Sequence, residues 1–578
     1  MTGRGPETLR PPDAVWHEPP SVDVDVVDVL VEELRLPRPL CTLLAVRGHV
    51  DPERAKDFLR PRLEHRADPA LLADGPEAAA RISAAIDAGE TILLHGDYDV
   101  DGICATALLA RWLTRLGARV VPFVPHRLKD GYDFSDAGVA AAQTNEATLV
   151  VTVDCGTVAH DAVARAGAAG IDVIVTDHHQ PGATLPPAVA VVNPHRVDCT
   201  YPFDDLCGTG IAFALAELVA RERNVPTDGL IELLDLVALA TVADLVPLRG
   251  ENRVLVHFGL RRFVDSRVPG VRALLEVAGV DPSEINAGHL GFQLAPRINA
   301  VGRIGDAKEG LELLLTDDDA RAAELAGRLD VLNTERRDED QRTLEEALEQ
   351  LADSFDPTRD FGVVIAGEGW HPGVIGIVAS RVVDRVHRPV VMLALGPDGG
   401  RGSARSVPGF HLYEALSACA EHLERFGGHE QAAGMDIHRD AIPAFRDHFN
   451  AESERRFDGT PPRPSRRPDA AIQLDDIDTS LVHWLGYLGP HGIGNRGPLF
   501  HARGVMLDGA REVGTNHLKV SLRAGSTRLE GIGFGLWDRF VDASLEEGRW
   551  DVLFRLERNE WRGRVSAQAK LVDLQRAS

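Results

Sequence analysis

Alternating apolar and polar stretches in the first half of the chain predict an α/β fold. Short apolar runs typical of strands are separated by segments whose apolar residues have helical spacing. The strand-like runs lie at residues 91–94, 120–124, 149–153 and 173–176, and the helical segments include 77–88 and 105–116. Strands that alternate with helices favour a parallel sheet with right-handed crossovers. Helical patterns then dominate from residue 210 to about residue 278.

The middle of the chain predicts a connector and a second α/β unit. Residues 318–352 form a long polar stretch with one apolar stripe, a pattern typical of a helix with a single buried face. Strand-like runs at 361–366 and 389–394 follow, with a helical segment at 374–386 between them. Residues 458–468 are rich in Pro and Arg and have the composition of a linker.

The last part of the chain changes to a period of two. Residues 517–523 and 550–556 alternate apolar and polar positions, which favours antiparallel hairpins and a small β-barrel of the OB-fold type. Lys519, Arg523 and Arg528 lie on or beside one hairpin, and a basic face with aromatic platforms is how OB-folds hold single strands. The alternative for the tryptophans of this region is a place in the barrel core.

The first 75 residues are irregular and marked by prolines, with mild helical spacing only at 52–59. We expect them to form an arm packed on the domain that follows. The predicted organisation is an N-terminal arm (1–75), a parallel-sheet domain (76–275), a helical connector (276–356), a second α/β domain (357–457) and a linker with an OB-fold barrel (458–578).

Composition narrows the class of protein. The chain has 578 residues, enough for about three or four domains. Its formal net charge of −26 argues against indiscriminate binding along nucleic-acid backbones, although a basic groove on an acidic surface is compatible with it. Six scattered cysteines without a Cys-x-x-Cys pair, together with the absence of a signal peptide or a membrane-spanning apolar run, predict a cytoplasmic protein.

Aspartates and histidines directly follow four apolar runs. These segments are 95–102 with Asp97, Asp99 and Asp101, then Asp154, then Asp177-His178-His179, and finally Asp244 after the run 240–243, which we interpret as strand-like. In an open α/β sheet, ligands collect at the carboxyl ends of parallel strands. Carboxylates gathered there require a cation, and oxygen ligands with an imidazole suit Mn²⁺ or Mg²⁺. The pattern predicts a two-metal phosphodiesterase.

Two other interpretations of these segments are weaker. The series Asp97-x-Asp99-x-Asp101 resembles the start of an EF-hand loop, but the twelfth position is Leu108 rather than glutamate, and a strand precedes it. A solvated acidic turn explains any one aspartate but not four similar clusters. Because adjacent side chains in extended backbone point to opposite sides, only one of His178 and His179 is expected to ligate a given metal.

The four segments resemble the motifs of the DHH phosphoesterase superfamily, and within it those of the bacterial single-strand-specific exonucleases. The likeness extends from about residue 76 to the C-terminus and includes further motifs at residues 125–127, 294–303, 332–337, 369–376, 402–406 and 427–434. Two places depart from the family pattern. Asp133 stands where the family usually has the last residue of Gly-Tyr-Gly, and His491 and Arg496 replace Phe and Pro in Pro-Phe-Gly-x-Gly-Asn-Pro.

The resemblance implies a set of site residues. Two Mn²⁺ or Mg²⁺ ions would be held by Asp99, Asp101, Asp154, His178 and Asp244, with His95 completing the shell and His179 donating to the phosphate or the leaving group. The implied substrate contacts are Arg127, Arg297, Asn299, Arg303, Ser403, Arg405 and His429. For Ser403, Arg405 and His429 the alternative is a solvated turn, and for Arg297 and Arg303 it is capping of helix carbonyls or pairing with Asp306.

The resemblance also implies a function, namely metal-dependent 5′-to-3′ hydrolysis of single-stranded DNA in repair and recombination. A monomer acting with single-stranded-DNA-binding protein and a helicase is expected from the family. A small-substrate phosphoesterase acting on nanoRNA, cyclic dinucleotides or pyrophosphate is the second hypothesis, but small substrates need neither the barrel nor the long helix. The third is an inactive nucleic-acid-binding scaffold, which the filled ligand positions disfavour.

Overall fold

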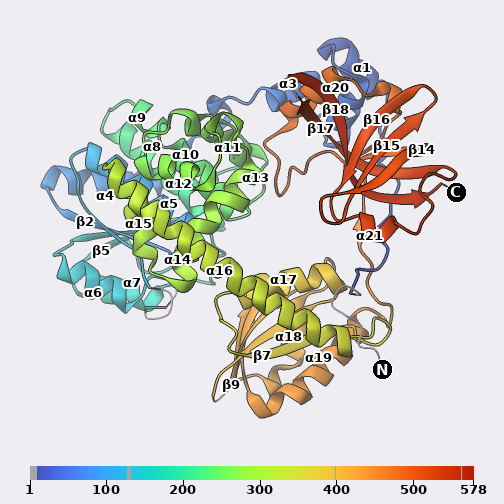
Figure 1. The fold of residues 1–578 in the computed structure, drawn as a ribbon. Helices are drawn as coiled ribbons and strands as arrows, with labels where there is room; N and C mark the ends of the chain where they lie inside the picture. The colour runs from blue at the N-terminus through green and yellow to red at the C-terminus, as the bar shows by residue number, and fades with distance from the viewer. Residues whose placement is uncertain (1–8, 127–129, 132, 398, 562, 578) are drawn as a thin grey trace. The chain divides into compact units, whose positions relative to one another are not determined.

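The structure is a computed structural model that describes residues 9–126, 130–131, 133–397, 399–561 and 563–577 (Figure 1). The chain divides into two compact units. One unit comprises residues 18–302, 306–330 and 467–578, and the other comprises the residues up to 17 with 303–305 and 331–466. Across the described residues, no helix is both long and apolar enough to cross a membrane.

A five-stranded parallel sheet forms the centre of the first unit, which confirms the prediction. Its order is β3-β2-β4-β5-β6, and every neighbouring pair is parallel. The strands are β2 (Thr91–Gly96), β3 (Arg119–Phe123), β4 (Leu149–Val153), β5 (Asp172–Thr176) and β6 (Ala190–Val192), with α4 (Gly75–Ala88), α5 (Val100–Arg115), α6 (Asp136–Thr144) and α7 (His160–Ala168) between them or before them. All five residues of β4 are buried, because a parallel sheet is covered on both faces.

Helices follow the sheet, as predicted for residues 210–278. They are α8 (Gly208–Glu222), α9 (Asp228–Ile231), α10 (Leu234–Ala243), α11 (Gly250–Arg262), α12 (Pro269–Ala278), α13 (Ala287–His289), α14 (Ala295–Ile304) and α15 (Ala307–Leu315). The interpretation of residues 240–243 as strand-like is wrong, because they form the last turn of α10, and Asp244 caps that helix. The first eight residues of α10 are buried, so its apolar positions do not show helical spacing.

The N-terminal helices share a core with the C-terminal barrel. Residues of α1 (Val24–Leu34), α2 (Arg38–Val46) and α3 (Pro52–Leu59) lie in one buried cluster with barrel residues such as Phe500 and Phe554. The expectation that this region is irregular outside 52–59 is wrong for α1 and α2. The prolines of this region suggested irregular structure. In α2, however, Pro37 is the N-cap and Pro39 lies in the first turn, where proline fits a helix.

The barrel is closed, as predicted. Its strands are β14 (Phe500–Val513), β15 (His517–Ala524), β16 (Thr527–Gly533), β17 (Trp550–Trp561) and β18 (Arg564–Arg576), with the short β13 (Ala470–Ala471) beside β14 and the helices α20 (Thr479–Leu485) and α21 (Trp537–Phe540). Pairing of β14 with β17 closes the ring.

Loop 486–496, which precedes the barrel, is fastened to the segment that follows Asp244. The N–H of Leu248 donates to the carbonyl of Ile493 at 2.6 Å. The buried guanidinium of Arg253 on α11 donates to the carbonyls of Tyr487, Gly489 and Phe58 at 3.0, 2.7 and 2.6 Å. Three parts of the chain that are remote in sequence therefore meet around one arginine.

The second unit contains a mixed sheet in the order β10-β11-β9-β8-β7. Its elements are β7 (Val363–Glu368), α17 (Ile375–Val386), β8 (Val390–Leu395), β9 (Gly399–Arg405), α18 (Leu412–Ala418), β10 (Arg425–Gly428), β11 (Ala432–His438) and α19 (Ile442–Arg456), with β1 (Val15–Trp16) pairing with β12 (Ser465–Arg466). The predicted long helix is α16 (Asp319–Ser354), which joins the two units. Ser403 and Arg405, for which the sequence left a solvated turn as the alternative, lie in strand β9.

Candidate functional site

Acidic and imidazole side chains meet at the carboxyl ends of three parallel strands. Asp97, Asp99 and Asp101 follow β2, Asp154 follows β4, and His178 follows β5. In the register of the sheet, Gly96 lies opposite Val153, and Val153 lies opposite Thr176, so these strand ends are level. Asp244 joins the group from the C-terminus of α10. The sequence thus predicts the cluster, although one member arrives on a different element.

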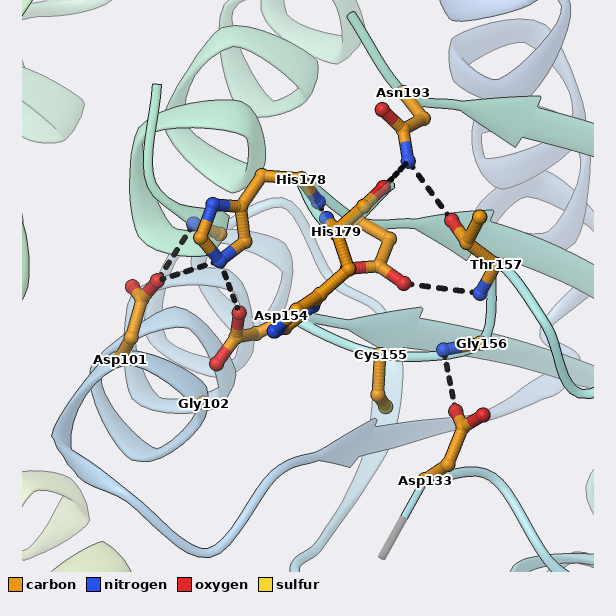
Figure 2. Close-up of polar contacts among 12 residues, drawn as sticks. Asp101, Gly102, Asp133, Asp154, Cys155, Gly156, Thr157, His178, His179 and Asn193 are labelled. Atoms are coloured by element: carbon orange, nitrogen blue, oxygen red, sulfur yellow. Dashed lines mark hydrogen bonds and ion pairs between the residues drawn. The ribbon is translucent and has the colours of Figure 1, made fainter. Parts of the chain in front are cut away.

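The ring of His178 points into the carboxylates (Figure 2). Its Nε2 lies 3.1 Å from Asp154 Oδ1, 3.6 Å from Asp244 Oδ2 and 3.9 Å from Asp101 Oδ2. Asp101, His178 and Asp244 form one group whose donor atoms all lie within 4.8 Å of one another. Asp97, Asp99 and Asp154 form a second such group, and His179 forms a third with Asp154 and His178.

Several buried polar atoms of this cluster have no hydrogen-bond partner among the described residues. They include Asp97 Oδ1, Asp154 Oδ1 and His178 Nε2. A buried polar atom without a partner is costly, and a buried charge without one is costlier still. Because these atoms are oxygens and an imidazole nitrogen aimed at one place, the arrangement fits divalent cations.

Burial and mutual repulsion raise the pKa values of the carboxylates in the protein without bound cations. Burial and the charge of Asp99 raise the pKa of Asp97 to about 8. Burial, with Asp101 and Asp99 nearby, raises the pKa of Asp244 to about 8 as well. Burial also raises the pKa of Asp154 well above its usual range, again with contributions from neighbouring carboxylates. Cations would remove this repulsion.

Helix N-termini hold two of the carboxylates in place. Asp99 is the N-cap of α5, and its Oδ1 accepts from the N–H groups of Asp101 and Gly102. The two oxygens of Asp101 accept from Gly208 and Thr209 at the start of α8, at 2.6 and 2.8 Å. A Cβ on Gly208 would lie 2.5 Å from the Cβ of Asp154, so α8 approaches this closely only because residue 208 is glycine.

The ring of His179 is oriented by Asp177. Its Nδ1 lies 2.7 Å from Asp177 Oδ1, and its carbonyl accepts from Asn193. Burial alone would lower the pKa of His179, but the hydrogen bond and the charge of Asp177 outweigh it and raise the pKa to about 9. Burial opposes the effect at Asp177 also, yet the bonds from His179 and from Thr157 lower the pKa of that carboxyl to about 2.

His95 and Asp97 differ from the sequence-based expectation. The ring of His95 is buried beside Phe123, Phe134 and Cys155, and His95 belongs to none of the metal-binding groups found among the described residues. Burial lowers the pKa of His95 to about 4. Asp97, to which the resemblance gives no role, instead joins Asp99 and Asp154. The sequence did offer one indication of this role, because Asp97 is the first aspartate after β2.

The departure at Asp133 has a local explanation. Its backbone has φ of +72°, a conformation that glycine adopts without strain, which accounts for the family's usual residue. The Asp133 side chain accepts from the N–H of Gly156 at 2.6 Å, one residue beyond Cys155 in the loop after Asp154 (Figure 2). Asp133 lacks the conformational freedom of glycine at this φ, but its side chain adds a hydrogen bond to the loop that carries Asp154.

The candidate substrate contacts before the long helix bind the protein itself. Arg297 pairs with Asp330 at 2.9 Å and donates to the carbonyl of Gln293. Asn299 Oδ1 accepts from the N–H of Val100 at 3.2 Å, and Arg303 donates to the carbonyl of Gly373 at 3.1 Å. These contacts correspond to the alternative in which the arginines cap backbone carbonyls. Arg127 lies outside the described residues.

The candidate contacts of the second domain come together at one end of its sheet. Arg405 on β9 donates to Ser403 Oγ at 3.1 Å and to the carbonyl of Ala404, and it pairs with no carboxylate among the described residues. A Cβ on Gly376, in the first turn of α17, would meet both side chains at 2.8 Å. His429 is exposed, and its N–H donates to the carbonyl of Ala432, the residue opposite Arg405 in the sheet. Burial lowers the pKa of Arg405.

The basic hairpin of the barrel is balanced by acidic neighbours. Arg523 donates to Asp508 at 2.7 Å, and Arg528 lies 3.8 Å from the same carboxylate. Lys519 lies 3.6 Å from Glu530 across the strand pair. The hairpin therefore presents less free positive charge than its sequence suggests.

Comparison with known proteins gives consistent matches along the chain. Residues 91–241 match the DHH family N-terminal domain, residues 360–454 the DHHA1 domain, and residues 468–573 the RecJ OB domain. The chain is 39% identical over 558 residues to the single-stranded-DNA-specific exonuclease RecJ of Dickeya dadantii (strain 3937), covering 92% of this chain and 95% of that protein.

Solved structures agree with the sequence matches. The crystal structure of RecJ in complex with Mn²⁺ from Thermus thermophilus has a TM-score of 0.82 at 32% identity, covering 97% of this chain and 79% of that chain. The complex of RecJ with Mg²⁺ from the same organism has a TM-score of 0.76 at 29% identity, covering 97% and 78%.

Proposed function

Because this chain belongs to the RecJ family of single-stranded-DNA-specific exonucleases, we propose that it removes nucleotides from single-stranded DNA in the 5′-to-3′ direction with two Mn²⁺ or Mg²⁺ ions. The observation that carries the metal requirement is the set of buried, unpartnered atoms on Asp97, Asp154 and His178. The metal complexes of the Thermus thermophilus relative support the same ions.

The two groups of donor atoms support a proposed assignment of the ions to residues. Asp101, His178 and Asp244 would hold one ion, and Asp97, Asp99 and Asp154 would hold the other. Asp154 also lies 3.1 Å from His178, so its carboxylate contacts a member of the first set. Asp97 takes the place in the ligand set that the resemblance gave to His95.

The protein's own groups then orient the reaction. When bound, the ions supply a water of lowered pKa and neutralise charge on the leaving 3′-oxygen. Asp99 and Asp101 are fixed by the amides of α5 and α8, so the ligand oxygens are arranged before substrate arrives. His179, held at Nδ1 by Asp177, donates a proton to the phosphate or to the leaving oxygen. No covalent protein nucleophile takes part.

The second domain holds the strand through its phosphates. Arg405, Ser403 and the first turn of α17 supply a guanidinium, a hydroxyl and backbone N–H groups, the combination that binds phosphate oxygens. His429 extends this surface at the same end of the sheet. Arg127, Arg297, Asn299 and Arg303 stay candidate contacts, with Arg297 and Asn299 acting chiefly through their internal bonds.

The cellular setting follows from the family. We propose a cytoplasmic monomer that acts in DNA repair and recombination beside single-stranded-DNA-binding protein and a helicase. The domain borders at residues 75, 275, 356 and 457 are part of the same proposal.

End-labelled substrates test the reaction directly. With Mn²⁺ or Mg²⁺, a 5′-labelled single strand releases labelled mononucleotide at once, whereas a 3′-labelled strand shortens progressively, and EDTA stops both. A blunt duplex and a dinucleotide serve as controls. Early release of label from the 3′ end would contradict the polarity, and preferential cleavage of the dinucleotide would favour the small-substrate phosphoesterase.

A further inference from the structure

Two histidines and a glutamate meet in the second α/β domain, on segments with no role in the proposed reaction. Glu421 and His422 belong to the 3-10 turn Ala420–His422, and His448 lies on α19. Their donor atoms lie within 4.8 Å of one another. His422 Nε2 and His448 Nδ1 are 3.2 Å apart, and Glu421 Oε1 lies 3.6 Å from the first nitrogen and 3.5 Å from the second.

These three distances describe a nearly equilateral triangle. A hydrogen bond between the imidazoles explains the edge of 3.2 Å, but the two edges to Glu421 are longer than an ordinary hydrogen bond. Ligands at 2.0–2.1 Å from a tetrahedral zinc ion are separated by about 3.3–3.4 Å, because a tetrahedron's edge is about 1.6 times its centre-to-corner distance. One shared ion therefore accounts for all three edges.

The surroundings suit a site with one open position. The His422 and His448 side chains are 19% and 35% exposed, whereas that of Glu421 is 72% exposed. The two imidazole rings meet almost perpendicularly, at 88°, with their nitrogens facing. Two imidazoles and one carboxylate favour a borderline ion such as Zn²⁺, whereas the carboxylate-rich centre of the first unit favours harder ions.

The geometry points to a second metal site, in which His422, His448 and Glu421 bind Zn²⁺ and water completes a tetrahedron. The ion clips the turn Ala420–His422 to α19. Strand β10 begins three residues after His422 and leads to His429, so the clip anchors the segment that precedes this candidate phosphate contact. The site is structural and takes no part in hydrolysis.

Cobalt spectroscopy of the full chain tests the site. Four-coordinate Co²⁺ absorbs visible light far more strongly than six-coordinate Co²⁺, so a titration in excess Mn²⁺ separates the two kinds of site. We expect one equivalent of strongly absorbing Co²⁺, displaced by Zn²⁺. His448→Gln and Glu421→Gln each weaken its binding by at least about tenfold. Zn²⁺ raises the melting temperature of the unsubstituted chain more than that of either variant.

A matched control is available in the same domain. His438 is 58% exposed and lies 3.7 Å from Asp440, and it belongs to none of the metal-binding groups found among the described residues. His438→Gln leaves the Co²⁺ titration unchanged. Because the Glu421 side chain is mostly exposed, Glu421→Gln decides the matter if His448→Gln fails to fold. Absence of the strong absorption, or its persistence at unchanged affinity in Glu421→Gln, would overturn the proposal.

Discussion

The two α/β sheets of this protein gather opposite charges. At the carboxyl ends of the parallel sheet, Asp97, Asp154 and His178 bring together buried polar atoms that have no hydrogen-bond partner among the described residues, and His179 is the neighbouring cation. In the mixed sheet, Arg405 lies beside Ser403 and the first turn of α17 without a recorded carboxylate among the described residues. Each arrangement is incomplete by itself. The first is suited to divalent cations, and under the proposed function the second is suited to a phosphate of the strand.

Under the proposed function, the acidic centre carries out hydrolysis and the region around Arg405 binds the strand. Loss of a ligand in the acidic centre removes the charge that stabilises the transition state, so kcat falls. Under the proposed function, loss of the Arg405 guanidinium removes a contact made equally with substrate and transition state, so KM is expected to rise. The predictions below run from the largest expected effect to the smallest.

Asp154→Asn preserves the shape of the side chain but removes the charge at the centre of both donor sets. We expect exonuclease activity to fall by at least about 10³-fold while binding of single-stranded DNA persists. Steady-state kinetics and a filter-binding assay measure the two properties. Asp161→Asn, at an exposed position on α7, is the matched control. Substantial activity in Asp154→Asn would contradict the proposed ligand roles.

Arg405→Gln tests the positive side of the comparison. Loss of a charge-assisted hydrogen bond to phosphate raises KM for a long single strand by roughly 10- to 100-fold and changes kcat little. Arg385→Gln, at an exposed position on the same domain's α17, should leave KM unchanged. A fall in kcat at constant KM would instead place Arg405 in the chemical step.

Arg297→Gln distinguishes structural support from DNA contact. Because Arg297 is largely buried and bound to Asp330 and to backbone carbonyls, its loss lowers the free energy of unfolding by about 1–3 kcal/mol. Chemical denaturation measures this change. Arg328, whose side chain is 58% exposed and pairs with Glu309, is the control, and Arg328→Gln should cost less than about 1 kcal/mol. An unchanged stability with a raised KM would identify Arg297 as a substrate contact.

Arg523→Gln has the smallest expected effect. Because Arg523 already bonds to Asp508, we expect the salt dependence of single-strand binding to be nearly unchanged. A direct phosphate contact would lower the slope of log affinity against log salt concentration by about 1. A salt titration of DNA binding measures the slope, and a fall of that size would show that Arg523 contacts a DNA phosphate.

Residues at the ends of parallel strands were the most predictable part of the site. Asp154 and His178 follow apolar runs whose spacing already indicates neighbouring strands, so their convergence follows from the sheet. Asp244 was assigned to the right cluster but to the wrong element, because a helix buried on all sides shows no helical period.

Partners distant in sequence were beyond prediction. Asp330 lies 33 residues from Arg297, and no local pattern links the two. Strand β9 reads Gly-Gly-Arg-Gly-Ser-Ala-Arg, and its small residues hide the alternation that marks a strand. The shared core of α1–α3 with the barrel joins the two ends of the chain, which depends on tertiary packing alone.

The fastening of Leu248 to Ile493, and of Arg253 to the carbonyls of Tyr487 and Gly489, bears on how this enzyme can be shortened. A truncation before residue 467 would leave a buried guanidinium exposed and withdraw one support from the chain segment that carries Asp244. We therefore expect removal of the C-terminal barrel to destabilise the segment that carries Asp244. The N-terminal helices would also lose their apolar partners, so both ends of the polypeptide belong in any shortened version intended for engineering.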